Sequence, residues 1–277
     1  MVRPGDPTVE LRRSYVRVAT VMTMLALVTN DDGVDSDGIR TLAHVARAAG
    51  LDVVVAAPGW DASGAGASIT AVEEGGRFRV EQRVWGDGRI GTVFAVEASP
   101  AFIVRAALGG AFGAPPDLVL SGINHGPNTG RAVLHSGTVG AALTGSVHGL
   151  RAMAVSMSVG PDMHWETAAH IAGIALQWLL GSEDAQMLNV NVPNVSRERL
   201  GGFRRARLAA VGAVQSTVTE ADQGYMKIAY HDADADQEPG TDAALLAAGI
   251  ACFTPLQATC EAQEVDTQGL GAAKGRG

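Results

Sequence analysis

Hydrophobic residues of this chain fall into short unbroken runs that alternate with stretches of helical periodicity. Residues 25–28 and 52–57 are largely apolar runs bounded by turn residues, the pattern of strands buried on both faces of a sheet. Between them, apolar side chains recur at helical spacing from Gly38 to Gly50, and this last glycine is a natural helix end. A strand, a helix and a strand in this order predict a βαβ unit, and hence an α/β fold with a mostly parallel sheet.

The same alternation continues toward the C-terminus. Ser99 and Pro100 are expected to begin a helix, as N-cap and first-turn proline. Residues 71–96 lack helical periodicity and are expected to form hairpin-like strands. Further elements expected are helices at 99–108, from 136, at 165–180 and at 243–248, and strands at 117–120, 152–158, 187–192 and 249–254. After Pro193 the pattern weakens, and residues 229–242 are expected to form a loop or arm.

These expectations divide the chain into three parts. Residues 1–23 are expected to be a disordered extension, and residues 257–277 a flexible tail. Residues 24–256 are expected to form one α/β domain, with a core at about 24–193 and an arm region at about 194–256.

Composition narrows the classes of function. The chain has 277 residues, of which 47% are hydrophobic and 18% charged, enough for one large α/β domain with or without an appendage. The net charge of −8 is mostly local, because residues 220–242 hold seven acidic residues and one basic residue, a net of −6. No basic tract could follow a phosphate backbone, which argues against nucleic acid as a dedicated partner.

Cysteine usage and hydropathy indicate a cytoplasmic protein without a membrane partner. Cys252 and Cys260 are close together and form no repeating framework. No run of 18 or more apolar residues occurs, so no spanning helix is expected. Arginines before the apolar residues 18–28 resemble the start of a signal peptide, but processing after that stretch would remove the first strand. A secreted or periplasmic protein is the alternative.

Polar residues gather where the first apolar strand ends. Asn30, Asp31, Asp32 and Gly33 follow it directly, with no basic residue nearby to neutralise the two acids. Ligands of open α/β sheets bind at the carboxyl ends of the strands, so this placement predicts a divalent-cation site. Gly33 would allow a sharp turn, and Asn30 is expected to brace it through side-chain hydrogen bonds to the backbone. An ordinary Asp-Asp-Gly turn is the alternative.

The segment after the second strand, residues 59–70, is rich in Gly, Ser and Ala. Its backbone N–H groups could surround an anion. It is not a dinucleotide-binding motif, because Gly64 and Gly66 are followed by Ile69 where the third glycine should stand. No Walker motif occurs in the chain either.

Two later segments, at 121–130 and 135–140, supply amides, hydroxyls and a helix start that suits an anion. His125 and His135 lie in them and are candidates to donate to a phosphate or a leaving group. Together with the acids, these segments offer an all-oxygen shell for Mg²⁺ or Mn²⁺, made of Asp31, Asp32, a hydroxyl such as Ser63 and the amide oxygen of Asn124.

Three motifs occur in a fixed order: TNDDG at 29–33, SGINHG at 121–126 and HSGTVGAA at 135–142. In this combination the chain resembles the SurE family of metal-dependent 5′/3′-nucleotidases. The resemblance extends from about residue 24 to 192. Outside these motifs it includes Ala57-Pro58, Ser63-Gly64, Thr241-Asp242 and Thr254-Pro255-Leu256.

The resemblance implies a Rossmann-like, three-layer α/β/α core with a C-terminal arm or hairpin extension. It also implies a phosphomonoesterase that hydrolyses nucleoside 5′-monophosphates, with 3′-monophosphates and other small phosphomonoesters as further substrates. One divalent cation, Mg²⁺ or Mn²⁺, would be held by Asp31, Asp32, Ser63 and Asn124. Exchange of the arm, with residues 218–242 as the candidate, would form a homodimer or homotetramer.

The catalytic residues implied are Asp31 and Asp32. Asp31 is expected to act as base toward a metal-activated water, and direct attack by a carboxylate is the alternative. Phosphate and substrate binding is assigned to Asn30, Gly64, Ser68, His125, Asn128, Ser136, Gly137 and Thr138.

The chain departs from the family pattern beside this expected site. Many relatives carry an Asp after the Ala-Pro pair and a basic residue before the Ser-Gly pair, where this chain has Gly59 and Ala62. Where relatives commonly read Gly-Thr-Pro-Ala-Asp, residues 98–102 read ASPAF, ending in Phe102. The segments after Pro58 and around residue 98 are therefore expected to decide what is hydrolysed. A nucleotide or metal sensor without turnover is the alternative function.

Overall fold

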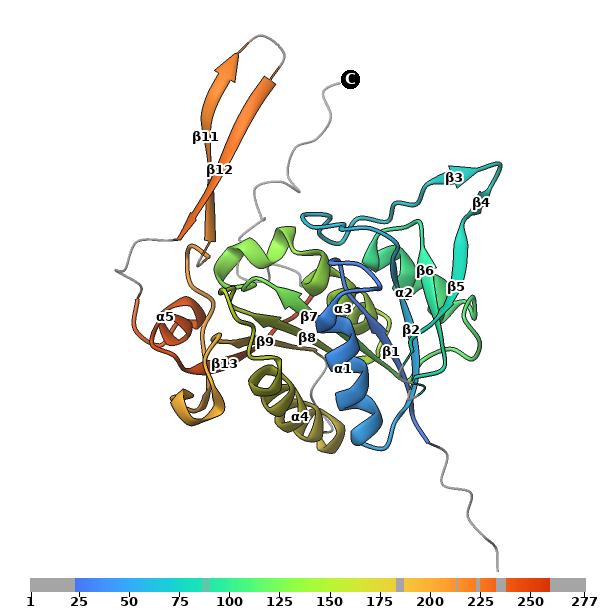
Figure 1. The fold of residues 1–277 in the computed structure, drawn as a ribbon, viewed down its shortest axis with the longest axis horizontal. Helices are drawn as coiled ribbons and strands as arrows, with labels where there is room; N and C mark the ends of the chain where they lie inside the picture. Colours follow the sequence, from blue (N-terminus) through green and yellow to red (C-terminus); the bar gives the residue numbers. More distant parts are fainter. Residues whose placement is uncertain are drawn as a thin grey trace, which may run out of the picture.

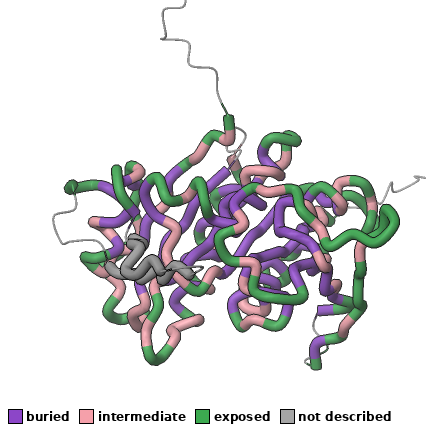
Figure 2. Tube along the Cα trace, turned by 90° about the horizontal axis from the view of Figure 1, so that it is seen from above, coloured by how far each residue is buried: buried purple, intermediate pink, exposed green. Residues whose placement is uncertain are grey.

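The computed structural model describes residues 23–86, 88, 90–182, 187–212, 214–222, 225–232 and 238–259, with the backbone alone over the strands between 214 and 232. The extension expected at 1–23 and the tail expected at 257–277 lie almost wholly outside the described residues. Figure 2 shows that buried residues concentrate along the central strands and that exposed residues occupy the surrounding loops.

One large sheet forms the centre of the molecule. Its strands are β1 (Leu25–Thr29), β2 (Asp52–Pro58), β5 (Val80–Val84), β6 (Thr92–Val96), β7 (Leu118–His125), β8 (Arg151–Met157), β9 (Met187–Val192), β10 (Phe203–Arg205) and β13 (Ala251–Pro255). Their order is β10-β13-β9-β8-β7-β1-β2-β6-β5 (Figure 1). The strands from β9 to β6 are parallel, whereas β5 and β13 run antiparallel to β6 and β9. The predicted mostly parallel α/β sheet is confirmed.

Helices cover both faces of this sheet. They are α1 (Asp37–Ala48), α2 (Pro100–Leu108), α3 (Gly137–Val147), α4 (Trp165–Gly181) and α5 (Asp242–Ala247), with short 3₁₀ helices η1 (Gly130–His135) and η2 (Arg197–Arg199). Helices α1 and α4 pack on one face, and α2 and α3 on the other (Figure 1). The three-layer α/β/α arrangement is therefore confirmed. No helix in the described part of the chain is long and apolar enough to cross a membrane.

Serine hydroxyls begin two of the helices next to the polar segments. The Ser36 hydroxyl accepts the N–H of Ile39 at 3.5 Å and begins α1. The Ser136 hydroxyl accepts the N–H of Val139 at 3.1 Å and begins α3, as the sequence predicts. Each hydroxyl satisfies one N–H that the first helical turn leaves free.

The N-cap expected at Ser99 and the first-turn proline expected at Pro100 are confirmed. The hydroxyl of Ser99, however, makes no hydrogen bond to the N–H groups of the helix. It donates instead to the carbonyl oxygen of Ser68 at 2.5 Å and accepts the N–H of Thr70 at 3.2 Å. The hydroxyl therefore ties the loop after β2 to the start of α2.

Strand β7 extends further than its sequence predicts. Ser121 and Gly122 follow the apolar run at 117–120 and suggest a polar loop, yet the strand continues to His125. Gly122 permits this because its φ is +124°, and a Cβ there would lie 2.2 Å from the carbonyl oxygen of Val155 on β8. The expected loop is thus a strand of irregular register that carries polar side chains to the sheet edge.

Two strands project from the domain as a hairpin (Figure 1). Strands β11 (Val214–Asp222) and β12 (Tyr225–Asp232) pair antiparallel with each other. A loop or arm was expected over 229–242; residues 229–232 belong to strand β12 and not to a loop, and the hairpin already begins at Val214. Hairpin strands also occur where they are expected within 71–96, as β5 with β6 and as β3 (Glu73–Glu74) with β4 (Arg77–Phe78).

Candidate functional site

The turn after β1 presents the two adjacent acids at the carboxyl edge of the sheet. Gly33 has a φ of +98°, and the N–H of Val34 donates to the carbonyl oxygen of Pro58 at 2.9 Å. The amide nitrogen of Asn30 donates to the Gly33 carbonyl oxygen at 3.0 Å and to the Ser36 hydroxyl at 2.8 Å. Asn30 is fully buried and braces the turn as the sequence predicts. Its amide nitrogen is therefore committed to the turn and not open to a substrate.

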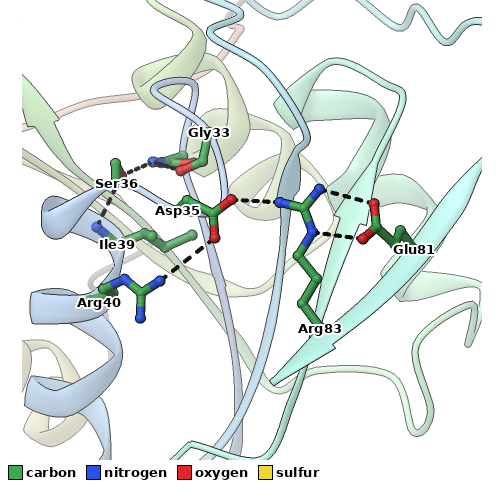
Figure 3. A network of polar contacts seen from close by, with 8 residues as sticks. Gly33, Asp35, Ser36, Ile39, Arg40, Glu81 and Arg83 are labelled. Carbon is green, nitrogen blue, oxygen red and sulfur yellow. Dashed lines mark hydrogen bonds and ion pairs between the residues drawn. The ribbon is translucent and has the colours of Figure 1, made fainter. Parts of the chain in front are cut away.

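Ion pairs hold the outer side of the same turn (Figure 3). Asp35 lies between two guanidinium groups, 2.5 Å from Nη1 of Arg83 and 3.6 Å from Nη2 of Arg40. Arg83 also pairs with Glu81 at 2.9 Å, and both belong to β5. The guanidinium of Arg40 lies over the Trp85 ring, 4.6 Å from its centroid. Together these contacts fasten the turn to α1 and to the edge strand, although each exposed ion pair alone contributes little to stability.

Asp31 is the more buried of the two acids, with 4% of its surface exposed. Its Oδ1 accepts a hydrogen bond from the hydroxyl of Thr138 in the first turn of α3. A Cβ on Gly137 would lie 2.8 Å from Oδ2 of Asp31, so a glycine is needed where the helix approaches the carboxylate. Burial raises the pKa of Asp31, and the hydrogen bond from Thr138 opposes that shift.

Asp32 is partly exposed and lies against the end of β7. Its Oδ2 accepts the backbone N–H of His125 at 3.0 Å. Burial raises the pKa of Asp32 to about 6, and the negative charges of Asp31 and Asp61 add to the shift while the N–H of His125 opposes it. The two carboxylates therefore repel one another at a site where both are poorly hydrated.

The loop after β2 contributes an acid that the sequence analysis did not single out. The N–H of Ala62 donates to the carbonyl oxygen of Asp31 at 2.7 Å, which fixes the loop against the first turn. Asp61 accepts both the N–H and the hydroxyl of Ser63, at 2.9 and 2.5 Å, and these bonds lower the pKa of Asp61. The hydroxyl proton of Ser63 is committed to Asp61, while its oxygen lone pairs remain available to a cation. The signal in the sequence is an acid between Pro58 and Ser63.

The end of β7 supplies an amide and continues into a second polar network. The amide nitrogen of Asn124 donates to the carbonyl oxygen of Gly126 at 2.7 Å, and its amide oxygen accepts from no described residue. Asn128 instead donates to the hydroxyl of Ser156 at 2.8 Å, and its carbonyl oxygen accepts the amide of Asn191 at 2.9 Å. The Asn128 side chain is thus tied to the neighbouring strand β8.

The glycine-rich loop after β2 packs directly on the amino end of α3. A Cβ on Gly140 would lie 2.5 Å from the carbonyl oxygen of Gly66. Gly64 is exposed on this loop and has a φ of +79°. Ser68, further along, is held by the hydrogen bond from Ser99. The expected anion-binding loop and helix end are therefore neighbours, and Ser68 is drawn toward α2.

Three predicted segments thus meet at one edge of the sheet, joined by the contacts of Asp31, Asp32 and their neighbours. Oxygen donors predominate there: two carboxylates, one hydroxyl and one amide. No cluster of three or more His, Cys, Asp or Glu suited to a metal exists among the described residues, so a cation would also need neutral oxygens and water. No ion pair within the described chain involves either acid. A hard divalent cation fits, because it would neutralise two poorly hydrated carboxylates through oxygen ligands.

Comparison with known proteins gives consistent matches. The family model described as Survival protein SurE matches residues 26–214. The 5′-nucleotidase SurE of Aeromonas hydrophila is 35% identical over 258 residues, which cover 90% of this chain and 98% of that protein. The 5′-nucleotidase SurE of Synechococcus sp. (strain RCC307) is 40% identical over 189 residues, which cover 65% of this chain and 66% of that protein. Among solved structures, the SurE protein from Aquifex aeolicus has a TM-score of 0.70 and 30% identity, covering 87% of this chain and 96% of that one.

Proposed function

The chain belongs to the SurE family, and on that premise we propose that it is a phosphomonoesterase that hydrolyses nucleoside 5′-monophosphates with one divalent cation. The observation that carries the proposal is the carboxylate pair of Asp31 and Asp32 at the sheet edge, neither of which forms an ion pair with a described residue. The 5′-nucleotidase name of the relatives supports the reaction class. Hydrolysis of 3′-monophosphates is a further part of the proposal.

The cation would be held by Asp31, Asp32, the hydroxyl of Ser63 and the amide oxygen of Asn124. Mg²⁺ and Mn²⁺ suit such oxygen donors. When bound, an ion of this kind polarises a phosphoryl oxygen and lowers the pKa of a coordinated water.

The chain's own groups would orient and complete the site. The hydroxyl of Thr138 holds the Asp31 carboxylate in one orientation, and Asp31 is the proposed proton acceptor for the attacking water, with direct carboxylate attack as the alternative. The amino end of α3, at Ser136 and Gly137, favours negative charge on the phosphoryl group. His125 is exposed and its backbone N–H is bonded to Asp32, and its imidazole is the proposed donor to a phosphate oxygen or leaving group.

Substitution of the acids tests the reaction. Asp31→Asn and Asp32→Asn should each lower metal-dependent phosphate release from adenosine 5′-monophosphate by about 10²- to 10⁴-fold, because a cation ligand or proton acceptor is lost. Asp37→Asn, an exposed acid in the first turn of α1, is the matched control and should stay close to wild type. Chelation should abolish wild-type activity, and Mg²⁺ or Mn²⁺ should restore it.

Two results would contradict the proposal. Full activity of a folded Asp31→Asn protein, verified by circular dichroism, would show that the site is misassigned. Wild-type protein that binds Mn²⁺ and nucleotide but hydrolyses no monophosphate would favour the second candidate function, a sensor. This candidate is considered because Ala62 stands where many relatives carry a basic residue.

We also propose where the protein acts and how it assembles. The chain would act in the cytoplasm, for which cysteine usage is the support, with Cys252 free and buried. It would assemble as a homodimer or homotetramer through the hairpin of β11 and β12.

A further inference from the structure

A hollow of about 420 Å³ opens over the loop that follows β2. Two segments far apart in the sequence form it, the loop after β2 and the residues just before α2. Its main lining side chains are Trp60, Asp61, Ala62, Ser63, Thr70 and Ser99. The hydrogen bonds of Ser99 to residues 68 and 70 hold these two segments together. Its volume lies within the range of pockets that bind small molecules.

The hollow shares residues with the proposed reaction site. Ser63, a proposed cation ligand, lines it. Asp61 also lines it, and its charge acts on both Asp31 and Asp32. The N–H of Ala62 is bonded to the Asp31 carbonyl oxygen at 2.7 Å. A phosphoryl group held at the carboxylates would therefore place the rest of a phosphomonoester in this hollow.

The lining has a distinctive chemistry. Trp60 is 42% exposed and offers an aromatic surface on which a flat ring can stack. Thr70 adds an exposed hydroxyl, and no Lys, Arg or His is among the lining residues. The one charged lining residue is Asp61, whose carboxylate is held by the N–H and hydroxyl of Ser63. Such a surface accepts a neutral aromatic group and repels a second anion.

We propose that this hollow is the leaving-group pocket, and that it selects phosphomonoesters with a neutral, ring-bearing leaving group, a nucleoside above all, over substrates with further phosphates. This selection rests on the phosphomonoesterase function proposed above. Phe102 stands where many relatives have an Asp, but it does not line the hollow. Its ring packs against that of Phe78, with the centroids 5.0 Å apart.

Charge selection is tested by comparing kcat/KM for adenosine 5′-monophosphate with that for tripolyphosphate. Asp61→Asn keeps an acceptor for Ser63 but removes the charge, and should shift the ratio about two- to fivefold toward tripolyphosphate, the size expected for an exposed charge. Ala62→Arg should shift it further in the same direction. Asp52→Asn and Ala48→Arg make the same charge changes at the opposite edge of the sheet and should leave the ratio unchanged.

Stacking is tested at Trp60. Trp60→Ala should raise KM for adenosine 5′-monophosphate about tenfold and leave glycerol 2-phosphate, which has no ring, within about twofold. Trp60→Phe keeps an aromatic face for stacking and should recover most of this loss. Adenosine alone should quench the tryptophan fluorescence of wild type but not of Trp60→Phe, a readout that needs no turnover.

The outcomes separate the two proposals. Hydrolysis of monophosphates with substrate ratios that none of the variants at positions 60, 61 and 62 changes would overturn the pocket assignment alone. Absence of phosphate release from every phosphomonoester would overturn the proposed function, whereas adenosine quenching that depends on Trp60 would still support the pocket.

Discussion

Asp31 and Asp32 are neighbours in the chain, but their side chains are held by different elements of the fold. The carboxylate of Asp31 accepts from the hydroxyl of Thr138 on α3, whereas that of Asp32 accepts from the N–H of His125 on β7. Each acid is thus oriented by a separate element, and burial raises the pKa of both. A site arranged in this way is unfavourable for two negative charges until a cation joins them.

The raised pKa of Asp32 predicts a pH-dependent gain in stability for Asp32→Asn in the metal-free protein. Its pKa is about 6 in the native state against an ordinary value of 3.8, so the stabilising protonated form is fully present below about pH 4 and lost as pH rises through 6. Thermal unfolding in a chelator should show the variant more stable than wild type at pH 7, by on the order of 2 kcal/mol, and similar to it at pH 4.

Metal addition provides the control for this prediction. Mg²⁺ or Mn²⁺ should stabilise wild type more than Asp32→Asn at pH 7, because only wild type offers both carboxylates. An unfolding temperature of the metal-free variant that falls below that of wild type as pH rises would contradict the sign.

At the scale of elements, helix α1 reaches the site through a backbone contact. Gly38 in its first turn packs on β7, where a Cβ would lie 1.9 Å from the carbonyl oxygen of Ile123. Gly38→Ala should therefore destabilise the protein by about 2 to 4 kcal/mol and displace the strand that carries Asn124. Gly173→Ala is the matched control in α4, since its Cβ would meet nothing within 4 Å, and it should stabilise by about 0.5 to 1 kcal/mol. Denaturant unfolding measures both, and equal midpoints for Gly38→Ala and wild type would contradict the close packing.

The elements themselves could be read from the sequence because their periodicity is local. The runs at 25–28 and 52–57 and the helical repeat between them specify β1, β2 and α1 without knowledge of any partner. The end of β7 could not be read in this way. Ser121 and Gly122 have the composition of a loop. They continue the strand because Gly122 has no side chain, which lets the carbonyl group of Val155 on β8 approach it closely.

In the candidate site, too, the residues next to a buried strand could be predicted from the sequence, and those placed by contacts between distant segments could not. Asp31 and Asp32 stand out because they follow a buried strand, and Asn30 was expected to brace their turn. Asp61 was missed because its relation to both acids depends on how the loop after β2 folds back onto Asp31, a contact between residues 31 and 62 that no local pattern encodes. The hydrogen-bond partners of the Ser99 hydroxyl could not be predicted for the same reason, since they lie on that loop.

At the scale of the whole molecule, the strand order explains why the polar segments meet. Strand β1 lies between β2 and β7, so the three segments that follow these strands emerge side by side at the carboxyl edge. The alternation of strands and helices predicts a parallel sheet but not this order. The segments meet because β7 pairs with β1, although β5, β6 and α2 lie between these two strands in the chain.

The base of the projecting hairpin is fastened to the segment that leads into α3. Asp242 is fully buried; its Oδ2 accepts the N–H of Gly130 at 2.8 Å and its Oδ1 accepts that of Ala209 at 2.9 Å. A Cβ on Gly130 would lie 2.7 Å from the carbonyl group of Val211. The residues on either side of the hairpin therefore hold their place in the domain through contacts that do not involve the hairpin.

This arrangement allows the proposed arm to be tested by removal. Strands β11 and β12 pair with no other strand of the described chain, and a two-stranded hairpin in water is marginally stable by itself. A second copy of the chain would supply the missing partner. Replacing residues 214–232 with a short Gly-Ser linker should convert the proposed oligomer to monomers, measured by light scattering. It should leave the domain folded, because Ala209 and Asp242 lie outside the replaced segment.

A second replacement separates arm exchange from a general effect of shortening an exposed hairpin. Residues 73–77, in the short pair β3 and β4, are exposed, and replacing them with the same linker should leave the mass of the wild-type assembly unchanged. If the variant without 214–232 keeps the wild-type mass, the contacts between copies must lie elsewhere on the domain. If wild type is itself a monomer, the hairpin is stable without a partner copy, and exchange is excluded.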